Sequence, residues 1–502
     1  MRNILKCFFI YFLLIPLSNK AQTTPKHEFR GAWIATVNNI DWPSRPGLSP
    51  ETQQKEAKEM LNLLSSLGIN AVIFQARPAA DAFYPSALEP WSRYLTGTQG
   101  QHPGYDPLAF WIDECHKRNM EFHLWCNPYR VTQNAQEPLS TSHVAFRHPE
   151  WIINYGGKLY FNPGLPETKA FIVEVIRDVV SRYDVDAIHF DDYFYPYPVN
   201  GQPFPDQETF RQYPNSFSSN QIADWRRNNV DEVILRLSQT IKATKPWVKF
   251  GISPFGVWRN QYVDPRGSAT RAGITNYDDL YADILKWLSN GWIDYVTPQL
   301  YWHIGHPSVD FKHLCQWWNS NSFGKALYIG QAPYKIDDKS EPADWRNPQQ
   351  IPQQIRFIRR IKDIDGSVFY SAKHFKRNLL GLQDSLTKKL YATPAIVPPM
   401  PWISKVSPKT PVAVSLKNNT ISWQPPASMN EMEVAQRYII YCTRKKKSFN
   451  PNDGRSVLMV TKSTAIKTPV NKGKKKKYFI RVASLNRINN ESKSSEPLKV
   501  KF

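Results

Sequence analysis

The sequence predicts an α/β protein, in which a (β/α)8 TIM barrel is followed by a small all-β sandwich. Three observations support this prediction. Eight apolar, strand-like runs alternate with amphipathic segments between residues 28 and 392, a proline-rich stretch follows, and short strands with period-two alternation occupy the rest. The 502 residues exceed one typical domain, and a content of 41% hydrophobic and 13% aromatic residues suffices for a large core. This composition excludes global disorder.

Eight strand-like runs define the predicted barrel. They begin at Phe29, Asn70, Glu121, Val185, Lys249, Ile293, Ala326 and Ser367. A doubly wound open sheet is the alternative, but such sheets usually have fewer strands and a glycine-rich first turn, which this sequence lacks. We therefore expect a barrel over residues 28–392.

Amphipathic segments between these runs predict the outer helices. The first has Ser49 as its N-cap, Pro50 at the first helical position and Gly68 as its stop. Further helices are predicted over 167–183, 229–244 and 278–291.

The N-terminus has the pattern of a signal peptide over residues 1–21. Arg2 and Lys6 form a basic region, residues 7–17 are apolar, and cleavage is expected after Ala21. An apolar run of about 11 residues is too short to span a bilayer. Because Cys7 lies at the start of the apolar run and not after it, we expect no lipid anchor. The mature protein is predicted to be periplasmic or secreted.

The stretch 393–411 contains six prolines and is predicted to be a stiff linker. Residues 412–502 then contain short strands with turn residues between them. Trp423 early in this region and a Tyr-x-Ile-x-Val strand from Tyr478 resemble a fibronectin type III domain.

The positive charge is concentrated in this C-terminal region. Residues 402–502 contain 21 Lys and Arg against 5 acidic residues, which is +16 of the total net charge of +21. The runs 444–447 and 472–477 are either solvated loops or a surface that attracts a polyanion. For an exported chain we expect an anionic envelope surface as partner, and not nucleic acid.

The cysteine and histidine spacing predicts neither a disulfide framework nor a metal site. Four cysteines remain after residue 21, with no CxxC spacing, so at most one chance disulfide is expected. A metal site built from His123, His189 and Asp191 is conceivable, but no HxH or HExxH spacing supports it. No cofactor is predicted.

In barrels of this kind the active site lies at the carboxyl ends of the strands. On the fourth predicted strand, alternation directs Ala187, His189 and Asp191 inward, and Asp192 lies where the strand opens into a loop. The other candidates for this rim are Gln75, Arg77, His123, Trp125, Asn127, Ser253, Gln299 and Tyr301 from strands, and Asp41, Trp42, Asp81, Arg130, Tyr193 and Trp302 from loops.

Adjacent carboxylates at a polar and aromatic rim fit the hydrolysis of glycosidic bonds. One carboxylic acid donates a proton to the leaving oxygen, and a second carboxylate attacks the sugar or activates water. Neighbouring carboxylates push their pKa values apart, so that one can stay protonated. Asp191 and Asp192 are the candidates, and the second carboxylate could equally be Asp81 or Asp41.

Several of these candidates also have a purely structural interpretation. Asp191 could pair with Arg77 across the barrel, and Asp81 could cap a loop. His189 could be a hydrogen-bonded core histidine, which is the commoner role of such a residue. Tyr301 and Trp302 could be packing residues.

Six sequence blocks between residues 28 and about 385 carry a resemblance to a known family. They are EFRGAWIATVNNIDWPS from Glu28, NAVIFQARPAADAFYPSALEPWS from Asn70, WCNPYRV from Trp125, YFNPG from Tyr160, AIHFDDYFYP from Ala187 and TPQLYW from Thr297. Together they resemble the glycosyl-hydrolase-like 10 family of bacterial envelope proteins. The resemblance implies a (β/α)8 barrel that hydrolyses the glycan strands of peptidoglycan, possibly strands without stem peptides.

Peptide-free strands expose lactyl carboxylates, which Arg77, Arg130 and Arg259 could bind because a guanidinium group matches a planar carboxylate. The characterised member of the family is a lipoprotein without a basic sandwich, so location and exact substrate do not follow from the resemblance. The alternative hypothesis is a non-catalytic glycan-binding envelope protein on a barrel scaffold.

Overall fold

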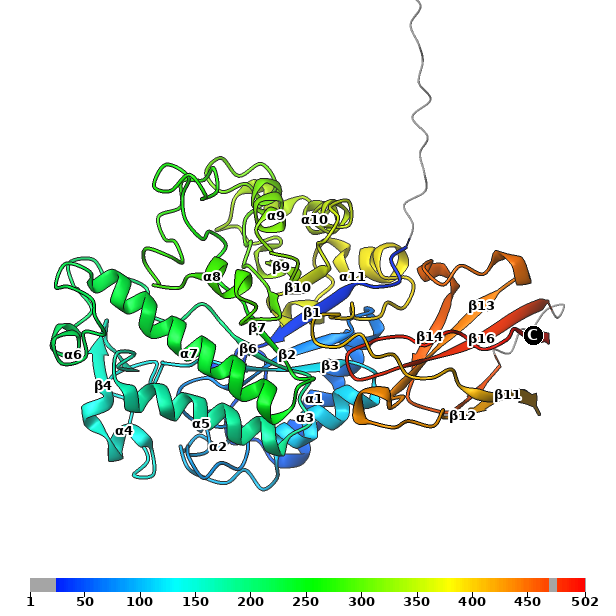
Figure 1. Cartoon of the computed structure of the whole chain (residues 1–502), viewed down its shortest axis with the longest axis horizontal. Coiled ribbons are helices and arrows are strands. Elements are labelled where there is room, and N and C mark those ends of the chain that lie inside the picture. Colours follow the sequence, from blue (N-terminus) through cyan, green and yellow to red (C-terminus); the bar gives the residue numbers. More distant parts are fainter. Residues whose placement is uncertain (1–23, 469–475, 502) are drawn as a thin grey trace, which may run out of the picture.

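The computed structural model describes residues 24–468 and 476–501, so the predicted signal peptide lies outside the described residues. The barrel strands are β1 Phe29–Ile34, β2 Ala71–Arg77, β3 Glu121–Cys126, β6 Ala187–Phe190, β7 Lys249–Ile252, β8 Tyr295–Val296, β9 Ala326–Gln331 and β10 Gly366–Phe369. All are parallel and close into a barrel in the order β1-β10-β9-β8-β7-β6-β3-β2 (Figure 1). The predicted fold class is confirmed.

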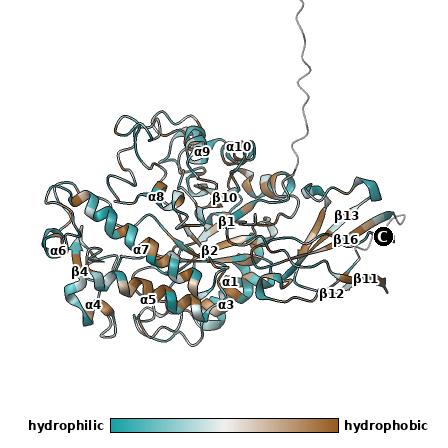
Figure 2. Cartoon of the chain, viewed as in Figure 1, coloured by the Kyte–Doolittle hydropathy of each residue, from teal (hydrophilic) through white to brown (hydrophobic). Residues whose placement is uncertain are grey.

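Long helices cover the outside of the barrel, and short helices lie within its loops (Figure 1). They are α1 Pro50–Ser66, α2 Arg93–Thr96, α3 Pro107–Lys117, α4 Val144–Arg147, α5 Pro166–Arg182, α6 Gln207–Gln212, α7 Ile222–Thr244, α8 Ile284–Ser289, α9 Phe311–Ser320, α10 Gln350–Ile358 and α11 Leu382–Ser385. Hydrophobic and hydrophilic bands alternate along α5 and α7, as expected for helices with one covered face (Figure 2). In the described part of the chain, no helix is long and apolar enough to cross a membrane.

The ends of the helices follow local capping. Ser49 caps α1 as predicted, because its side-chain oxygen accepts a hydrogen bond from the amide of Thr52 at 3.3 Å. The predicted helix over 278–291 is shorter in the structure. The Asp283 side chain accepts a hydrogen bond from the amide of Lys286, which sets the start of α8 at Ile284.

Aromatic side chains fill the barrel interior. The ring of Phe29 stacks on that of Tyr328 with centroids 3.9 Å apart, and the ring of Tyr295 lies 5.3 Å from that of Tyr328. Residue 251 in β7 must be glycine, because a Cβ there would lie 2.0 Å from the Tyr295 ring. Gly251 therefore makes the room that lets Tyr295 occupy the interior.

A two-stranded hairpin follows β3 that the sequence did not predict. Its strands are β4 Ile152–Tyr155 and β5 Lys158–Phe161, and Gly156 and Gly157 turn between them with φ of +56° and +72°. Tyr160 forms an isolated bridge with Arg130 in the loop after β3. The hairpin therefore builds one wall above the barrel rim.

The C-terminal region forms two antiparallel sheets. Its strands are β11 Val412–Lys417, β12 Thr420–Gln424, β13 Arg437–Thr443, β14 Val457–Thr461, β15 Ala465–Lys467, β16 Lys477–Leu485 and β17 Leu498–Lys501. One sheet has the order β11-β12-β15 and the other β14-β13-β16-β17. The predicted short strands are thus present, together with β11 and β17, and the fibronectin type III resemblance stays a prediction.

This sandwich packs against the base of the barrel, at the amino ends of the strands (Figure 1). The side chain of Asn489 donates to Glu121 at 2.8 Å, and Arg487 pairs with Asp184 at 2.6 Å. In the proline-rich stretch, the indole of Trp402 donates to Asp294 at 3.1 Å. The stretch 393–411 is therefore packed on the base and does not act as a free spacer.

Candidate active site

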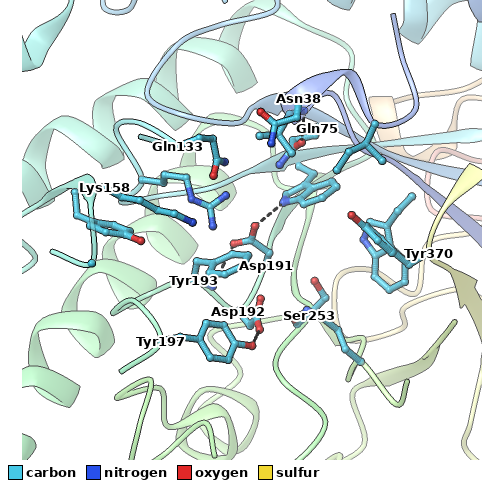
Figure 3. Close-up of a pocket in the computed structure, with 18 of the residues that line it drawn as sticks. Asn38, Gln75, Gln133, Lys158, Asp191, Asp192, Tyr193, Tyr197, Ser253 and Tyr370 are labelled. Carbon is cyan, nitrogen blue, oxygen red and sulfur yellow. Dashed lines mark hydrogen bonds between the residues drawn. The ribbon is translucent and has the colours of Figure 1, made fainter. Parts of the chain in front are cut away.

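A pocket of about 470 Å³ lies at the carboxyl ends of the barrel strands (Figure 3). It is lined by Trp33, Val37, Asn38, Ile40, Gln75, Trp125, Arg130, Gln133, Tyr155, Gly156, Lys158, Tyr160, Asp191, Asp192, Tyr193, Tyr197, Val199, Ser253, Gln299, Tyr301 and Tyr370. Strand ends supply the floor and the hairpin β4–β5 supplies one wall. The volume falls in the range of small-molecule sites and is sufficient for one or two sugar rings.

Asp191 follows β6 directly and is 3% exposed. Its carboxyl group accepts hydrogen bonds from the indole of Trp125 at 3.1 Å, the side chain of Asn127 at 3.3 Å and the amide of Tyr193 at 3.3 Å. Burial, and next the negative charge of Asp192, raise the pKa of Asp191 to about 7. Asp191 is therefore able to hold a proton near neutral pH.

Asp192 is the second carboxylate of the pocket, and the hydroxyl of Tyr197 donates a hydrogen bond to it. Burial raises the pKa of Asp192 as well, and the hydrogen bonds from Tyr197 and Gln299 counteract part of this effect. Among the lining residues, only Asp191 and Asp192 carry carboxyl groups. The two groups thus offer a proton donor beside an anion.

Two cations face these carboxylates. The guanidinium of Arg130 lies over the ring of Tyr193, 4.2 Å from its centroid, and is 6% exposed. No ion pair within 4.0 Å joins Arg130 or Lys158 to a carboxylate among residues 24–468 and 476–501, and the Nε atom of Arg130 has no hydrogen-bond partner there. Burial, and next the charge of Arg130, lower the pKa of Lys158. Burial opposes the charge of Arg130, but the interactions with Tyr193 and Asp191 outweigh this effect and raise its pKa. A carboxylate on a ligand would add the direct ion pair that Arg130 lacks within the described ranges.

Aromatic rings line much of the remaining wall. The rings of Tyr301 and Tyr370 have centroids 6.0 Å apart and planes inclined by 29°, and Trp33 meets Tyr370 edge to face at 6.2 Å. Flat apolar faces of this kind stack on the C–H faces of sugar rings. The pocket therefore combines aromatic platforms with charged groups.

Several predicted site residues lie outside the pocket. Arg77 does not pair with Asp191, because it binds Glu89 through Nε at 2.8 Å and through a terminal nitrogen at 2.5 Å. Trp42 is fully buried and donates to the backbone of Gln53 at 2.9 Å. Arg77 and Trp42 therefore do not line the pocket, and the prediction that they contact a substrate there is wrong.

Asp81 and Asp41, the alternative second carboxylates, are also elsewhere. Asp81 is buried beside Gln99, which donates to it at 3.4 Å, and burial raises the pKa of Asp81 to about 7. Asp41 accepts hydrogen bonds from Ser371 and from the amide of Lys373, both at 2.8 Å. A raised pKa by itself therefore does not mark the pocket, and Asp192 is left as the partner of Asp191.

Three further candidates lie behind the pocket wall. Asn127 holds Asp191 and accepts from the amide of Arg130 at 2.9 Å. His189 is buried inside the barrel, in agreement with a hydrogen-bonded core histidine, and Trp302 packs edge to face on Phe255. No group of three or more His, Cys, Asp or Glu side chains in the described ranges is arranged to hold a metal ion.

The lining residues that the sequence did not indicate come mainly from loops and from the hairpin. They are Trp33, Val37, Asn38, Ile40, Gln133, Tyr155, Gly156, Lys158, Tyr160, Tyr197, Val199 and Tyr370. Tyr160 begins the block YFNPG and Tyr197 follows the block AIHFDDYFYP, so the aromatic residues around these two blocks were a signal for them. Trp33, Val37, Asn38 and Ile40 lie within the block that begins at Glu28.

Comparison with known proteins places these features in a family. The family model described as glycosyl hydrolase-like 10 matches residues 28–347. Glycosyl hydrolase YngK of Bacillus subtilis (strain 168) is 46% identical over 497 residues, which cover 97% of this chain and 96% of that protein. Glycosyl hydrolase DigH of Escherichia coli (strain K12) is 39% identical over 392 residues, 72% of this chain and 88% of that protein. Among solved structures, the PgaB (BpsB) glycoside hydrolase domain of Bordetella bronchiseptica matches with a TM-score of 0.46 at 11% identity, covering 73% of this chain and 99% of that one.

Proposed function

Because this chain belongs to the glycosyl hydrolase-like 10 family, we propose that it is a glycoside hydrolase that cleaves the glycan of bacterial cell walls. The observation that carries the proposal is the carboxyl pair Asp191 and Asp192 in an aromatic-lined pocket, with the pKa of Asp191 raised to about 7. A carboxyl group that keeps its proton near neutral pH beside one that ionises is the requirement for acid-catalysed glycoside cleavage.

In the proposed reaction Asp191 is the general acid. It transfers its proton to the glycosidic oxygen while the bond between that oxygen and the anomeric carbon breaks, and the departing sugar leaves as an alcohol. The ionised carboxylate of Asp192 faces the positive charge that develops at the anomeric carbon and ring oxygen. Water then adds to the anomeric carbon and returns a proton to the carboxyl pair.

The cations of the pocket support an anionic glycan as the substrate. Arg130 is buried and forms no ion pair within 4.0 Å in the described part of the chain. Lys158 of β5 lines the same pocket, close enough for the charge of Arg130 to lower its pKa (Figure 3). A carboxylate on the sugar chain would neutralise both, and the lactyl group of peptide-free peptidoglycan strands is such a carboxylate. Export, which the N-terminal residues predict, would bring the enzyme to this polymer.

The test is incubation of the protein with peptide-free glycan strands, followed by mass spectrometry of the products, which identifies both the bond cleaved and the end group. We expect shorter sugars from the native chain and a loss of at least about 10³-fold in kcat/KM for Asp191→Asn. Asp192→Asn should lose about 10²-fold or more. Asp113→Asn on the outer face of α3 is a matched control, since its ion pair with Lys117 is exposed.

The pH profile gives a second check. Because the acid must be protonated, kcat/KM should fall as pH rises above about 7, where Asp191 loses its proton. Full activity in both Asn variants would remove the proposed site. Binding of glycan without turnover, unaffected by either change, would favour the non-catalytic glycan-binding protein.

A further inference from the structure

A line of polar side chains runs through the barrel interior beneath the pocket, and the proposed reaction does not use it. Glu121 contacts Nε2 of His123 at 2.9 Å, and Nδ1 of His123 contacts the hydroxyl of Tyr295 at 2.9 Å. That hydroxyl contacts Nδ1 of His189 at 3.0 Å, and Nε2 of His189 contacts Oγ of Ser253 at 2.9 Å. All five residues are at most 1% exposed, and Ser253 lines the pocket.

The charge at the lower end fixes the direction of every hydrogen bond in this line. Burial opposes ionisation of Glu121, but the attractions of Lys249, His123 and Arg437 together outweigh it and hold the pKa of Glu121 below its usual range. An ionised carboxylate only accepts, so Nε2 of His123 must donate. Burial lowers the pKa of His123, and the ring is therefore neutral, which leaves its Nδ1 as an acceptor.

The direction continues to the pocket. Tyr295 has one hydrogen and gives it to Nδ1 of His123, so its oxygen accepts from Nδ1 of His189. Burial lowers the pKa of His189 well below its usual value, so this ring is neutral too and its Nε2 is an acceptor. Ser253 must therefore donate to His189.

A contact at the upper end of the line agrees with this direction. The indole nitrogen of Trp33 lies 3.4 Å from Nε2 of His189, and an indole N–H can only donate. At this length the contact supports Nε2 of His189 as an acceptor but is too weak to fix the tautomer without the Tyr295 hydroxyl. The other acceptor near Ser253 Oγ is the backbone oxygen of Phe190 at 3.3 Å, which also lies within the protein. In either case the hydroxyl hydrogen of Ser253 points away from the pocket.

We propose that Ser253 Oγ is a specificity-determining acceptor, which binds a hydroxyl or N–H group of the glycan, and that the line from Glu121 fixes this role. The inference rests on the proposed function for the identity of the ligand, but the hydrogen-bond directions do not depend on it. His189, Tyr295 and His123 are positioning residues in this account. A site with a committed acceptor rejects a sugar that offers only a lone pair at that point.

The lower anchor is shared between the two parts of the chain. Lys249 binds the oxygens of Glu121 at 2.6 and 2.7 Å, and Asn489 of the C-terminal sandwich donates to it at 2.8 Å. Arg437 in turn donates to the side-chain oxygen of Asn489. The sandwich thus helps to hold the carboxylate that orients the line.

The first test needs no glycan. In the full chain labelled with ¹⁵N-histidine, ¹⁵N spectra should show His123 as the neutral Nε2–H tautomer and His189 as the neutral Nδ1–H tautomer. The spectra of His123→Gln and His189→Gln identify the two signals. The opposite tautomer at either ring, or a charged ring at pH 7, would overturn the proposal even if the protein is a hydrolase.

The second test is a double-mutant cycle on the binding of peptide-free glycan strands, with Asp191→Asn present throughout to prevent turnover. Tyr295→Phe removes the hydroxyl between the imidazoles, so His189 can carry its proton on Nε2 and turn the Ser253 hydrogen into the pocket. We expect Tyr295→Phe to weaken binding about 5- to 50-fold when Ser253 is present, and to have no effect in Ser253→Ala.

Tyr328→Phe is the matched control. Tyr328 lies in the same layer of the interior, and its hydroxyl has no hydrogen-bond partner within the described ranges, so its removal should leave binding unchanged. Ser253→Thr keeps the hydroxyl and should bind more tightly than Ser253→Ala. Additive effects of Tyr295→Phe and Ser253→Ala would show that the line is only structural.

Discussion

The two ends of the barrel both contain buried charges, but in opposite states. At the base Glu121 is contacted by the cation of Lys249 and by Asn489. The attractions of Lys249, His123 and Arg437 together hold the pKa of Glu121 below its usual range against the effect of burial. At the rim Asp191 receives indole, amide and backbone donors and no cation within 4.0 Å among residues 24–468 and 476–501, and its pKa rises to about 7.

The difference shows that the charged groups that stabilise the fold and those that line the pocket lie at opposite ends of the same strands. The same strands carry both kinds of group: β3 begins with Glu121 and ends beside Trp125, and β7 begins with Lys249 and ends before Ser253. Charges that are paired and hydrogen-bonded hold the base together with the sandwich. The carboxyl groups at the rim have hydrogen-bond donors but no direct ion pair in the described part of the chain, and they line the pocket that a substrate would enter.

The largest effect on stability is expected for a substitution at the base of the barrel. Lys249→Met leaves the buried carboxylate of Glu121 without its cation and should lower the free energy of unfolding by about 3–5 kcal/mol. The shift of the denaturant midpoint, followed by fluorescence, measures this loss. Lys117→Met removes an exposed partner and should change stability by less than about 0.5 kcal/mol.

The double variant Lys249→Met with Glu121→Gln separates charge from packing. It should recover part of the loss, because no unpaired charge is left buried. A Lys249→Met protein as stable as the Lys117→Met protein would contradict the contrast between the ends of the barrel.

At the rim, removal of a buried charge should raise the free energy of unfolding, whereas at the base it should lower it. Asp191→Asn removes a group whose ionisation is opposed by burial, so it should stabilise the folded chain at pH 8. The pKa of Asp191 is about 7 in the folded chain and near 3.8 in the unfolded chain. This difference means that ionisation of Asp191 lowers the free energy of unfolding by at most about 4 kcal/mol. This loss of stability is absent near pH 4, grows as the pH rises to about 7, and is complete above pH 7. Melting temperatures of both proteins at pH 4.5 and pH 8 test this, and an equal difference at both pH values would refute it.

The contrast also explains which parts of the site the sequence could predict. Alternation along a strand is dictated by the backbone, so Gln75, Trp125 and Gln299 could be predicted as inward-facing, and all three line the pocket. Arg77 also lies on a strand, but its partner Glu89 comes from the loop that follows, and sequence gives no sign of which acid a buried arginine will bind. The hairpin β4–β5 lies inside a loop, so period-two alternation over four residues was too short to stand out.

Removal of the Arg130 charge, which forms no direct ion pair in the described residues, should affect glycan binding more than folding. Arg130→Met should weaken the binding of carboxylate-bearing glycan strands about 10- to 100-fold and leave neutral chitin oligomers nearly unaffected, as measured by calorimetry with Asp191→Asn present. The affinity of Arg130→Lys for these strands should lie between that of the protein with Arg130 and that of Arg130→Met, because an ammonium group cannot bind a carboxylate through two parallel hydrogen bonds. Since Arg130 lowers the pKa of Asp191, the alkaline limb of kcat/KM should move upward in an active Arg130→Met protein.

The smallest effect is expected for exposed lysines of the C-terminal sandwich, which belong to neither end of the barrel. Lys445, Lys446 and Lys447 are exposed in the sandwich, after β13. Their replacement by Gln should reduce retention on an anionic polymer about two- to tenfold at low salt, with little difference at 0.5 M salt, because exposed charges are screened. Hydrolysis of short soluble glycans should not change, since the run lies outside the pocket. Lys339, Lys362 and Lys376 on the barrel surface provide a control triple of equal charge, and equal loss of retention in both triples would show that net charge, and not the sandwich, attracts the polymer.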